Sequence, residues 1–204
     1  MHGDQFAKKA MLGEKLLLTD MKVSTMELVT AMITAAILAN EKRGLVSLAL
    51  KKEKALFGLT TRESLKIAPT GKGNSAWPSD TTEAGMLSAV GGSEKSVNEA
   101  VIAFIGDRVP NPEHDYLGRV KSTLANKGFL TREDKKVLGL KVSVVYHASD
   151  DQRSRIAAQG AGEATSLFSE LKSRPEIAAR LKKEIGSALA DRTQSDDSGP
   201  DMDR

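Results

Sequence analysis

The stretch STMELVTAMITAAILANEKRG, which runs from Ser24 to Gly44, decides the fold of this chain. Ser24 followed three residues later by Glu27 is a capping box, in which each side chain satisfies a free backbone N–H group at the start of a helix. Arg43 suits the negative end of a helix, and Gly44 supplies a left-handed stop. At 3.6 residues per turn, the apolar residues between these signals occupy nearly the whole helix circumference. They are Met26, Leu28, Val29, Ala31, Met32, Ile33, Ala35, Ala36, Ile37 and Leu38. The pattern predicts a core helix at 24–40 that is buried on all sides.

Amphipathic helices and short strands are predicted around this core helix. Helical patterns cover residues 82–90, 96–105, 113–127, 153–172 and 173–190, and a short helix is expected at 14–19. Strand patterns cover 45–50, 55–59, 65–68 and 137–146. Charged turns are expected at 51–54 and 131–136, and the second of these runs can alternatively form a short helix. We therefore predict a mostly α fold, with a single domain at 14–190 around the central helix and one or two short β-hairpins. A disordered acidic tail is expected at 191–204.

Composition limits the class of protein. The chain has 204 residues, enough for one domain with a sizeable core. It carries 30 Lys and Arg against 27 Asp and Glu, a net charge of +3. Residues 195–204 hold four Asp and one Arg, a net charge of −3, so residues 1–194 carry +6. This positive charge attracts phosphate-bearing partners weakly.

Cysteine is absent, which excludes disulfides and thiolate chemistry. With no apolar signal segment at the start and a core helix too alanine-rich to span a bilayer, we expect a cytoplasmic location.

No residue pattern in the sequence indicates catalysis. The three histidines lie far apart, and none has the helical spacing of a metal-binding pair. The carboxylates are scattered among lysines, and no nucleophile has an obvious base beside it. Gly71-Lys72 is not a phosphate-binding loop, because the required glycine and hydroxyl positions hold Lys66 and Gly73. We therefore expect a non-enzymatic protein with no cofactor and no metal.

Helix 113–127 and a hairpin at 137–147 together have the outline of a winged helix. In that interpretation Arg119, Lys121 and Lys127 would contact DNA phosphates. The alternative is a helix that packs by its apolar stripe and leaves its basic side chains in water. Acidic residues flank the basic ones and would repel phosphate, so nucleic acid ranks second among the expected partners. The same region can instead serve as a protein-interaction module.

Four short segments carry a resemblance to a known family. They are EKLLLTD at 14–20, the alanine-rich helix that ends in Arg43-Gly44, APTG at 68–71 and RVKSTLANKGFLT at 119–131. In order and spacing over residues 14–155 they resemble the Golgi phosphoprotein 3 family of eukaryotes and bacteria, and this chain looks like a divergent member of bacterial type. The resemblance implies a mostly helical single domain with a buried central helix. It also implies a peripheral membrane protein that binds phosphatidylinositol 4-phosphate.

The family's lipid site matches this chain only in part. When the shared helix ends are aligned, the family's tryptophan and first arginine fall near Ser24 and Ile33, and its later basic residues fall near His114 and Leu117. Of these positions only His114 could contact a phosphate, and only when it is protonated. Binding of an anionic lipid would therefore have to use nearby charges as well, so the head-group candidates are Arg43, His114, Arg119 and Lys121.

The strand material at 137–146 predicts a contact between protein chains. Val142, Val144, Val145 and Tyr146 give apolar surface on both faces of a short strand, more than a half-exposed edge normally carries. The alternative is that both faces are covered within the monomer. In the family that the chain resembles, the corresponding hairpin is associated with oligomer contacts, so we expect a homo-oligomer formed through this region.

Overall fold

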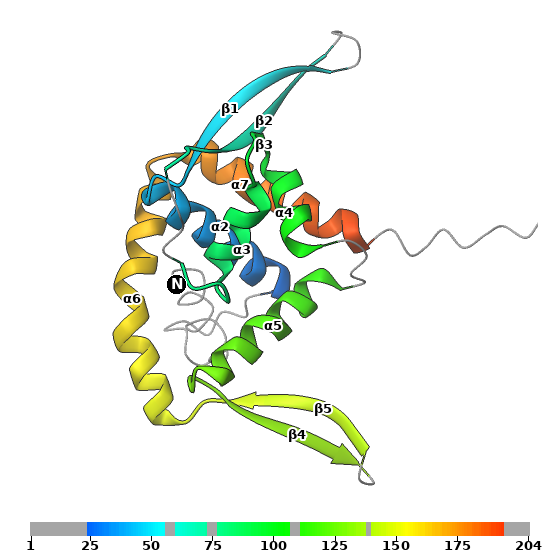
Figure 1. Ribbon diagram of the computed structural model, residues 1–204, viewed down its shortest axis with the longest axis vertical. Helices are drawn as coiled ribbons and strands as arrows, with labels where there is room; N and C mark the ends of the chain where they lie inside the picture. The colour runs from blue at the N-terminus through cyan, green and yellow to red at the C-terminus, as the bar shows by residue number, and fades with distance from the viewer. Residues whose placement is uncertain (1–23, 56–59, 73–76, 107–110, 138–139, 194–204) are drawn as a thin grey trace, which may run out of the picture.

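The computed structural model describes residues 24–55, 60–72, 77–106, 111–137 and 140–193. Within these ranges the chain is mostly helical, with two small antiparallel sheets (Figure 1). The helices are α2 (Thr25–Lys42), α3 (Thr82–Val90), α4 (Val97–Ile105), α5 (Pro112–Asn126), α6 (Asp150–Lys172) and α7 (Pro175–Thr193). The strands are β1 (Val46–Ala55), β2 (Thr60–Pro69), β3 (Lys95–Ser96), β4 (Thr131–Val137) and β5 (Leu140–His147). The short helix predicted at 14–19 lies outside the described residues.

Helix α2 begins and ends at the signals in its sequence. The Ser24 hydroxyl accepts a hydrogen bond from the Glu27 backbone N–H at 3.1 Å, and the Glu27 carboxylate accepts one from the Ser24 backbone N–H at 3.3 Å. At the other end Gly44 has a φ of 66°, which a residue without Cβ adopts at little cost. Side chains on every side of the helix are buried, from Leu28 to Asn40. Helices α3, α5, α6 and α7 and strand β1 all contact it.

The other helices close the core around α2. Helix α7 packs against α2 and α4 through Leu181, Ile185 and Leu189, the stripe that its periodicity predicts. Helix α7 begins at Pro175 and continues to Thr193. The disordered tail predicted at 191–204 is therefore wrong for residues 191–193, which are helical, and residues 194–204 lie outside the described ranges. Helix α6 is continuous through its glycines, and a Ser149/Gln152 capping box starts it three residues earlier than predicted.

The first hairpin is longer than the sequence predicts. Strands β1 and β2 pair from Val46↔Pro69 to Ala55↔Thr60, so the turn predicted at 51–54 is wrong. Opposite charges face one another across the strands in this stretch, as in Lys52↔Glu63, and such pairs support a ladder instead of interrupting it. The return strand predicted at 55–59 begins at Thr60, and residues 56–59 lie outside the described ranges.

The second hairpin uses residues that the sequence assigns to a turn or short helix. The run 131–136 belongs to strand β4, which pairs with β5 from Thr131↔His147 to Val137↔Leu140. The charged side chains of β4 are exposed, and Glu133 Oε2 lies 3.1 Å from His147 Nε2 across the ladder. Val137 therefore ends β4 and does not start the predicted strand. The two hairpins extend from opposite ends of the helical body (Figure 1).

A buried carboxylate holds the first sheet against the helices. Glu184 of α7 accepts a hydrogen bond from the Leu65 backbone N–H of β2 at 2.7 Å and from the Asn98 backbone N–H of α4 at 3.3 Å. Two ion pairs surround it, Lys66–Glu53 at 2.6 Å and Arg180–Glu63 at 2.9 Å. The charged side chains of this region therefore serve to hold the sheet and the helices together.

None of the helices in the described part of the chain combines the length and the apolar character that a membrane span requires.

The complete burial of Ile37 gives a stability prediction. Ile37→Asp places an unpaired charge in the core and is expected to lower the free energy of unfolding by about 4 kcal/mol or more. Ile37→Val removes one methylene and should cost only about 1 kcal/mol. Urea unfolding followed by circular dichroism measures both. Similar midpoints for Ile37→Asp and the wild type would contradict the burial of this position.

Candidate functional site

An arginine stacks on the chain's single tryptophan at the end of α2. The guanidinium carbon of Arg43 lies 3.4 Å from the centre of the Trp77 ring, within the range of a cation–π contact. The Arg43 side chain is exposed, whereas Trp77 is only 7 % exposed. The indole therefore forms a platform below a charge that faces water.

Asn40 fixes the position of this platform. Its side-chain oxygen accepts a hydrogen bond from Trp77 Nε1 at 3.0 Å. Its amide nitrogen donates to the carbonyl oxygens of Ala36 at 2.9 Å and Glu83 at 3.0 Å. Asn40 is 1 % exposed, so these bonds form away from water, where breaking them is costly. The indole, and with it the stacked guanidinium of Arg43, is held in place from below.

Two lysines lie near Arg43. Lys72 Nζ is next to Gly44, at 3.6 Å from the point that a Cβ would occupy on that glycine. Lys42 is exposed, and its Nζ donates to the Ser166 hydroxyl at 3.0 Å. We name Lys42, Arg43, Lys72 and Trp77 the Arg43 surface.

The cations of the Arg43 surface carry no counter-charge from the rest of the described chain. Glu41, the carboxylate next to them in sequence, is occupied by Arg174 through two hydrogen bonds of 2.7 and 3.0 Å. Among the described residues no carboxylate lies within ion-pair distance of Lys42, Arg43 or Lys72. The surface therefore has three positive charges available to an anion.

The other predicted head-group residues lie on α5. His114 is exposed near the start of that helix, with Nδ1 3.4 Å from a carboxylate oxygen of Glu113. Lys121 is half-buried in the middle of the helix. Lys127, at the far end, contacts Asp80, in the segment that follows Trp77. His114 and Lys127 are thirteen positions apart in the chain, about 20 Å at 1.5 Å per helical residue. Within the described ranges no hydrogen bond, ion pair or ring contact joins His114 to Arg43.

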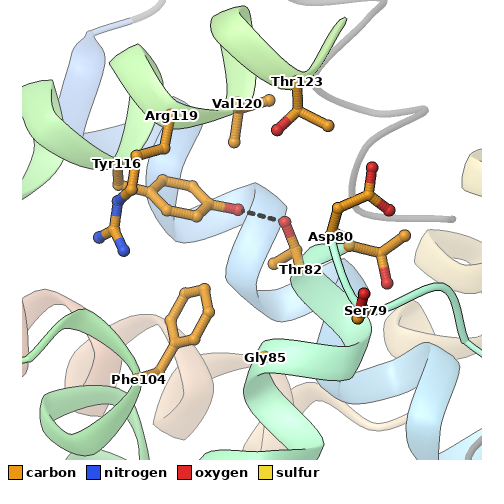
Figure 2. A pocket seen from close by; sticks show the side chains of 10 residues that line it. Ser79, Asp80, Thr82, Gly85, Phe104, Tyr116, Arg119, Val120 and Thr123 are labelled. Carbon is orange, nitrogen blue, oxygen red and sulfur yellow. Dashed lines mark hydrogen bonds between the residues drawn. The ribbon is translucent and has the colours of Figure 1, made fainter. Parts of the chain in front are cut away.

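Arg119, the fourth candidate, lines a pocket of about 310 Å³ between α3, α4 and α5 (Figure 2). The Thr82 and Tyr116 hydroxyls form a hydrogen bond of 2.8 Å at its centre, and the Phe104 and Tyr116 rings meet edge to face with centroids 5.6 Å apart. The remaining lining residues are Ser79, Asp80, Thr81, Gly85, Val120 and Thr123.

Charges at the rim of this pocket are paired. Arg119 Nε lies 3.2 Å from Asp115 Oδ2, and Lys127 Nζ lies 2.9 Å from Asp80 Oδ2. The hydrogen bond from Lys127 lowers the pKa of Asp80 below its ordinary value. Arg119 and Lys127 are also two of the three phosphate contacts of the winged-helix interpretation. Both already have acidic partners, although the order of helix α5 followed by hairpin β4–β5 matches that outline.

The comparisons with known proteins add no family to this geometry. A scan against models of known protein families finds no match for the chain. A search of curated proteins finds no match either. The resemblance to the Golgi phosphoprotein 3 family remains an expectation that depends on the segments quoted above. Among the described residues no cluster of three or more His, Asp or Glu side chains could hold a metal ion.

Sequence reasoning missed Lys72, Trp77 and Asn40 as parts of a site. The loop around Trp77 is recognisable by its glycines and its single aromatic residue, but nothing in the sequence connects it to the end of α2. The one available signal was Asn40, an amide in a helix whose buried residues are almost all apolar. Such a residue is buried only where it has hydrogen-bond partners.

The pair of Asp80 with Lys127 gives a prediction on pH. Because the folded-state pKa of Asp80 is lowered from 3.8, the stability from this pair is present above pH 3.8 and is lost as the pH falls through the folded-state value. The pair is partly exposed, so its contribution is under about 1 kcal/mol. Lys127→Gln should raise the Asp80 pKa toward 3.8, as measured by NMR titration of the carboxyl carbon. Lys121→Gln is the control, and an equal shift in both variants would contradict the assignment.

Proposed function

We propose that this protein is a non-enzymatic peripheral membrane protein, a single domain built around α2, that binds the anionic head group of a phosphoinositide. Phosphatidylinositol 4-phosphate is the lipid that the family resemblance suggests. The observation that carries the proposal is the exposed guanidinium of Arg43, stacked on a fixed indole and without a carboxylate partner among the described residues.

The chemistry of the Arg43 surface suits a phosphate monoester. An arginine guanidinium donates paired hydrogen bonds to phosphate oxygens, and hydrogen bonds to charged groups are stronger than neutral ones. Because Trp77 already holds the side chain of Arg43, less conformational entropy is lost when the anion binds. Lys42 and Lys72 add two positive charges, which fit a head group with phosphates at two positions.

The proposal changes the site that the resemblance suggests. It keeps Arg43 as the head-group contact and adds Lys42 and Lys72. His114, Arg119 and Lys121 become secondary charges, since they lie on α5 and two of them already have carboxylate neighbours. The net charge of +6 on residues 1–194 supports attraction toward an anionic membrane as a whole. DNA has less support as a partner, because Arg119 and Lys127 are paired.

Vesicle binding tests the proposed function. At low salt the protein should sediment with phosphatidylcholine vesicles that contain phosphatidylinositol 4-phosphate and stay in solution with pure phosphatidylcholine. Arg43→Gln removes a charged hydrogen-bond donor and should weaken binding about 10- to 100-fold. Lys182→Gln, which removes one exposed charge from α7, is the matched control and should bind nearly as well as the wild type.

Two results would contradict this proposal. One is equal sedimentation with charged and neutral vesicles at low salt, where screening is weakest. The other is an equal loss of binding in Arg43→Gln and Lys182→Gln, which would show a response to net charge and no particular use of the Arg43 surface. Vesicles of phosphatidylserine at matched charge separate recognition of the phosphorylated head group from general attraction.

We also propose that the β4–β5 hairpin contacts a second copy of the chain. Within the described ranges this sheet has two strands only, so the outer edge of each strand is open. The hairpin extends away from the helical body (Figure 1), yet Val144 of β5 is aliphatic. A second hairpin that pairs at an open edge and packs on the face of Val144 would cover this side chain and satisfy the edge hydrogen bonds.

Sedimentation velocity at matched concentrations tests this contact. Val144→Lys places a charge on the proposed contact face and should convert an oligomer into a folded monomer. Ser143→Lys adds the same charge to the exposed opposite face and should leave the oligomer unchanged. A wild-type monomer at tens of micromolar would rule out self-association of useful strength.

A further inference from the structure

We propose that the pocket between α3, α4 and α5 binds a small uncharged aromatic molecule that carries a hydroxyl group (Figure 2). None of the four residues of the Arg43 surface lines this pocket, so the inference does not depend on the proposed lipid binding. Its volume of about 310 Å³ lies at the lower end of the range for ligand sites, roughly 300 to 1,000 Å³. A compound with a single ring fits that size.

Aromatic and aliphatic side chains form one wall of the pocket. Phe104, Tyr116 and Val120 supply it, and the two rings meet edge to face at an angle of 70°. Opposite Phe104, a Cβ on Gly85 would lie 2.6 Å from the ring atom Cε2. The ring therefore lies directly against the backbone of α3, where only glycine leaves room for it. Aromatic rings pair favourably in edge-to-face or offset arrangements, so a ligand ring has a matched surface here.

Hydroxyl groups and one carboxylate form the other side. In Figure 2 the Tyr116 hydroxyl points across the pocket to Thr82, and Ser79, Asp80 and Thr123 lie beyond it, away from the Phe104 ring. The Asp80 side chain is half exposed at the rim, where its carboxylate can accept a hydrogen bond from a ligand hydroxyl. A ring with a hydroxyl at one end therefore matches both sides of the pocket at once.

The charges at the rim favour an uncharged ligand. Asp80 is paired with Lys127 and Arg119 with Asp115, so the rim has no excess of either sign. An anionic ligand would approach the carboxylate of Asp80, and a cationic one would compete with Lys127 for the same group. A hydroxyl group does neither, because it donates to the carboxylate without displacing the ion pair.

A titration with p-cresol, a single ring with one hydroxyl, tests the inference. A fragment with eight non-hydrogen atoms is expected to bind with a dissociation constant of about 1 mM. Saturable shifts of the Gly85 and Thr123 amide signals in ¹H–¹⁵N NMR spectra are expected at that concentration. Toluene, which lacks the hydroxyl, should bind about fivefold more weakly, since it forgoes one hydrogen bond. The anion p-toluate should also bind more weakly than p-cresol.

Two variants of α5 separate the pocket from the rest of the surface. Thr123→Trp fills the cavity from its half-exposed rim and should abolish saturable binding of p-cresol, while Ser122→Trp adds the same ring outside the pocket and should keep it. Asp80→Ala should reduce the preference for p-cresol over toluene without filling the pocket. The inference is overturned by the absence of saturable shifts in the wild type, by equal binding in both tryptophan variants, or by an unchanged preference in Asp80→Ala.

Discussion

The buried amide of Asn40 is the interaction on which the arrangement of this molecule depends. It lies near the end of an apolar helix, where a polar group is tolerated only if it is hydrogen-bonded. It connects α2 to the backbone of α3 and to the indole of Trp77. An apolar residue at position 40 would remove one hydrogen-bond partner from the Glu83 carbonyl and one from the Trp77 N–H group. Each lost hydrogen bond would lower the free energy of unfolding by about 1 to 3 kcal/mol. Asn40 therefore helps to fix both the start of α3 and the indole on which Arg43 stacks.

The charged residues divide into those that the fold uses and those that it leaves available. Glu184 of α7 binds backbone N–H groups of β2 and α4, and Glu41 of α2 is held by Arg174 in the link between α6 and α7, so these charges fix separate parts of the fold to one another. Exposed ion pairs such as Lys51–Glu94 contribute little energy. The cations of the Arg43 surface belong to the available charges, since they have no acidic partner in the described part of the chain. A concentration of unused charge beside a fixed aromatic ring distinguishes this place from the general basic character of the chain.

Sequence signals that act within a few residues predicted the structure well, and those that depend on a distant partner did not. The capping boxes at Ser24 and Ser96 place the starts of α2 and α4 to within a residue. The charged runs 51–54 and 131–136 are predicted as turns, because the residues that pair with them lie on another strand. The same limit applies to the site. Trp77 and Arg43 come into contact only in the folded chain, where Asn40 of the mostly apolar helix α2 holds the indole by a hydrogen bond.

The short segment 77–82 connects the two proposed binding regions of the molecule. Its first residue supports Arg43 from below, and its last four residues line the pocket and cap helix α3. The segment is held at both ends, by Asn40 through the indole and by Tyr116 through Thr82. A ligand that shifts Asp80 or Thr82 therefore acts on the same rigid stretch that positions Arg43. Any energetic coupling between an anion at the Arg43 surface and a ring in the pocket must be equal in both directions, because linkage between two binding sites is reciprocal.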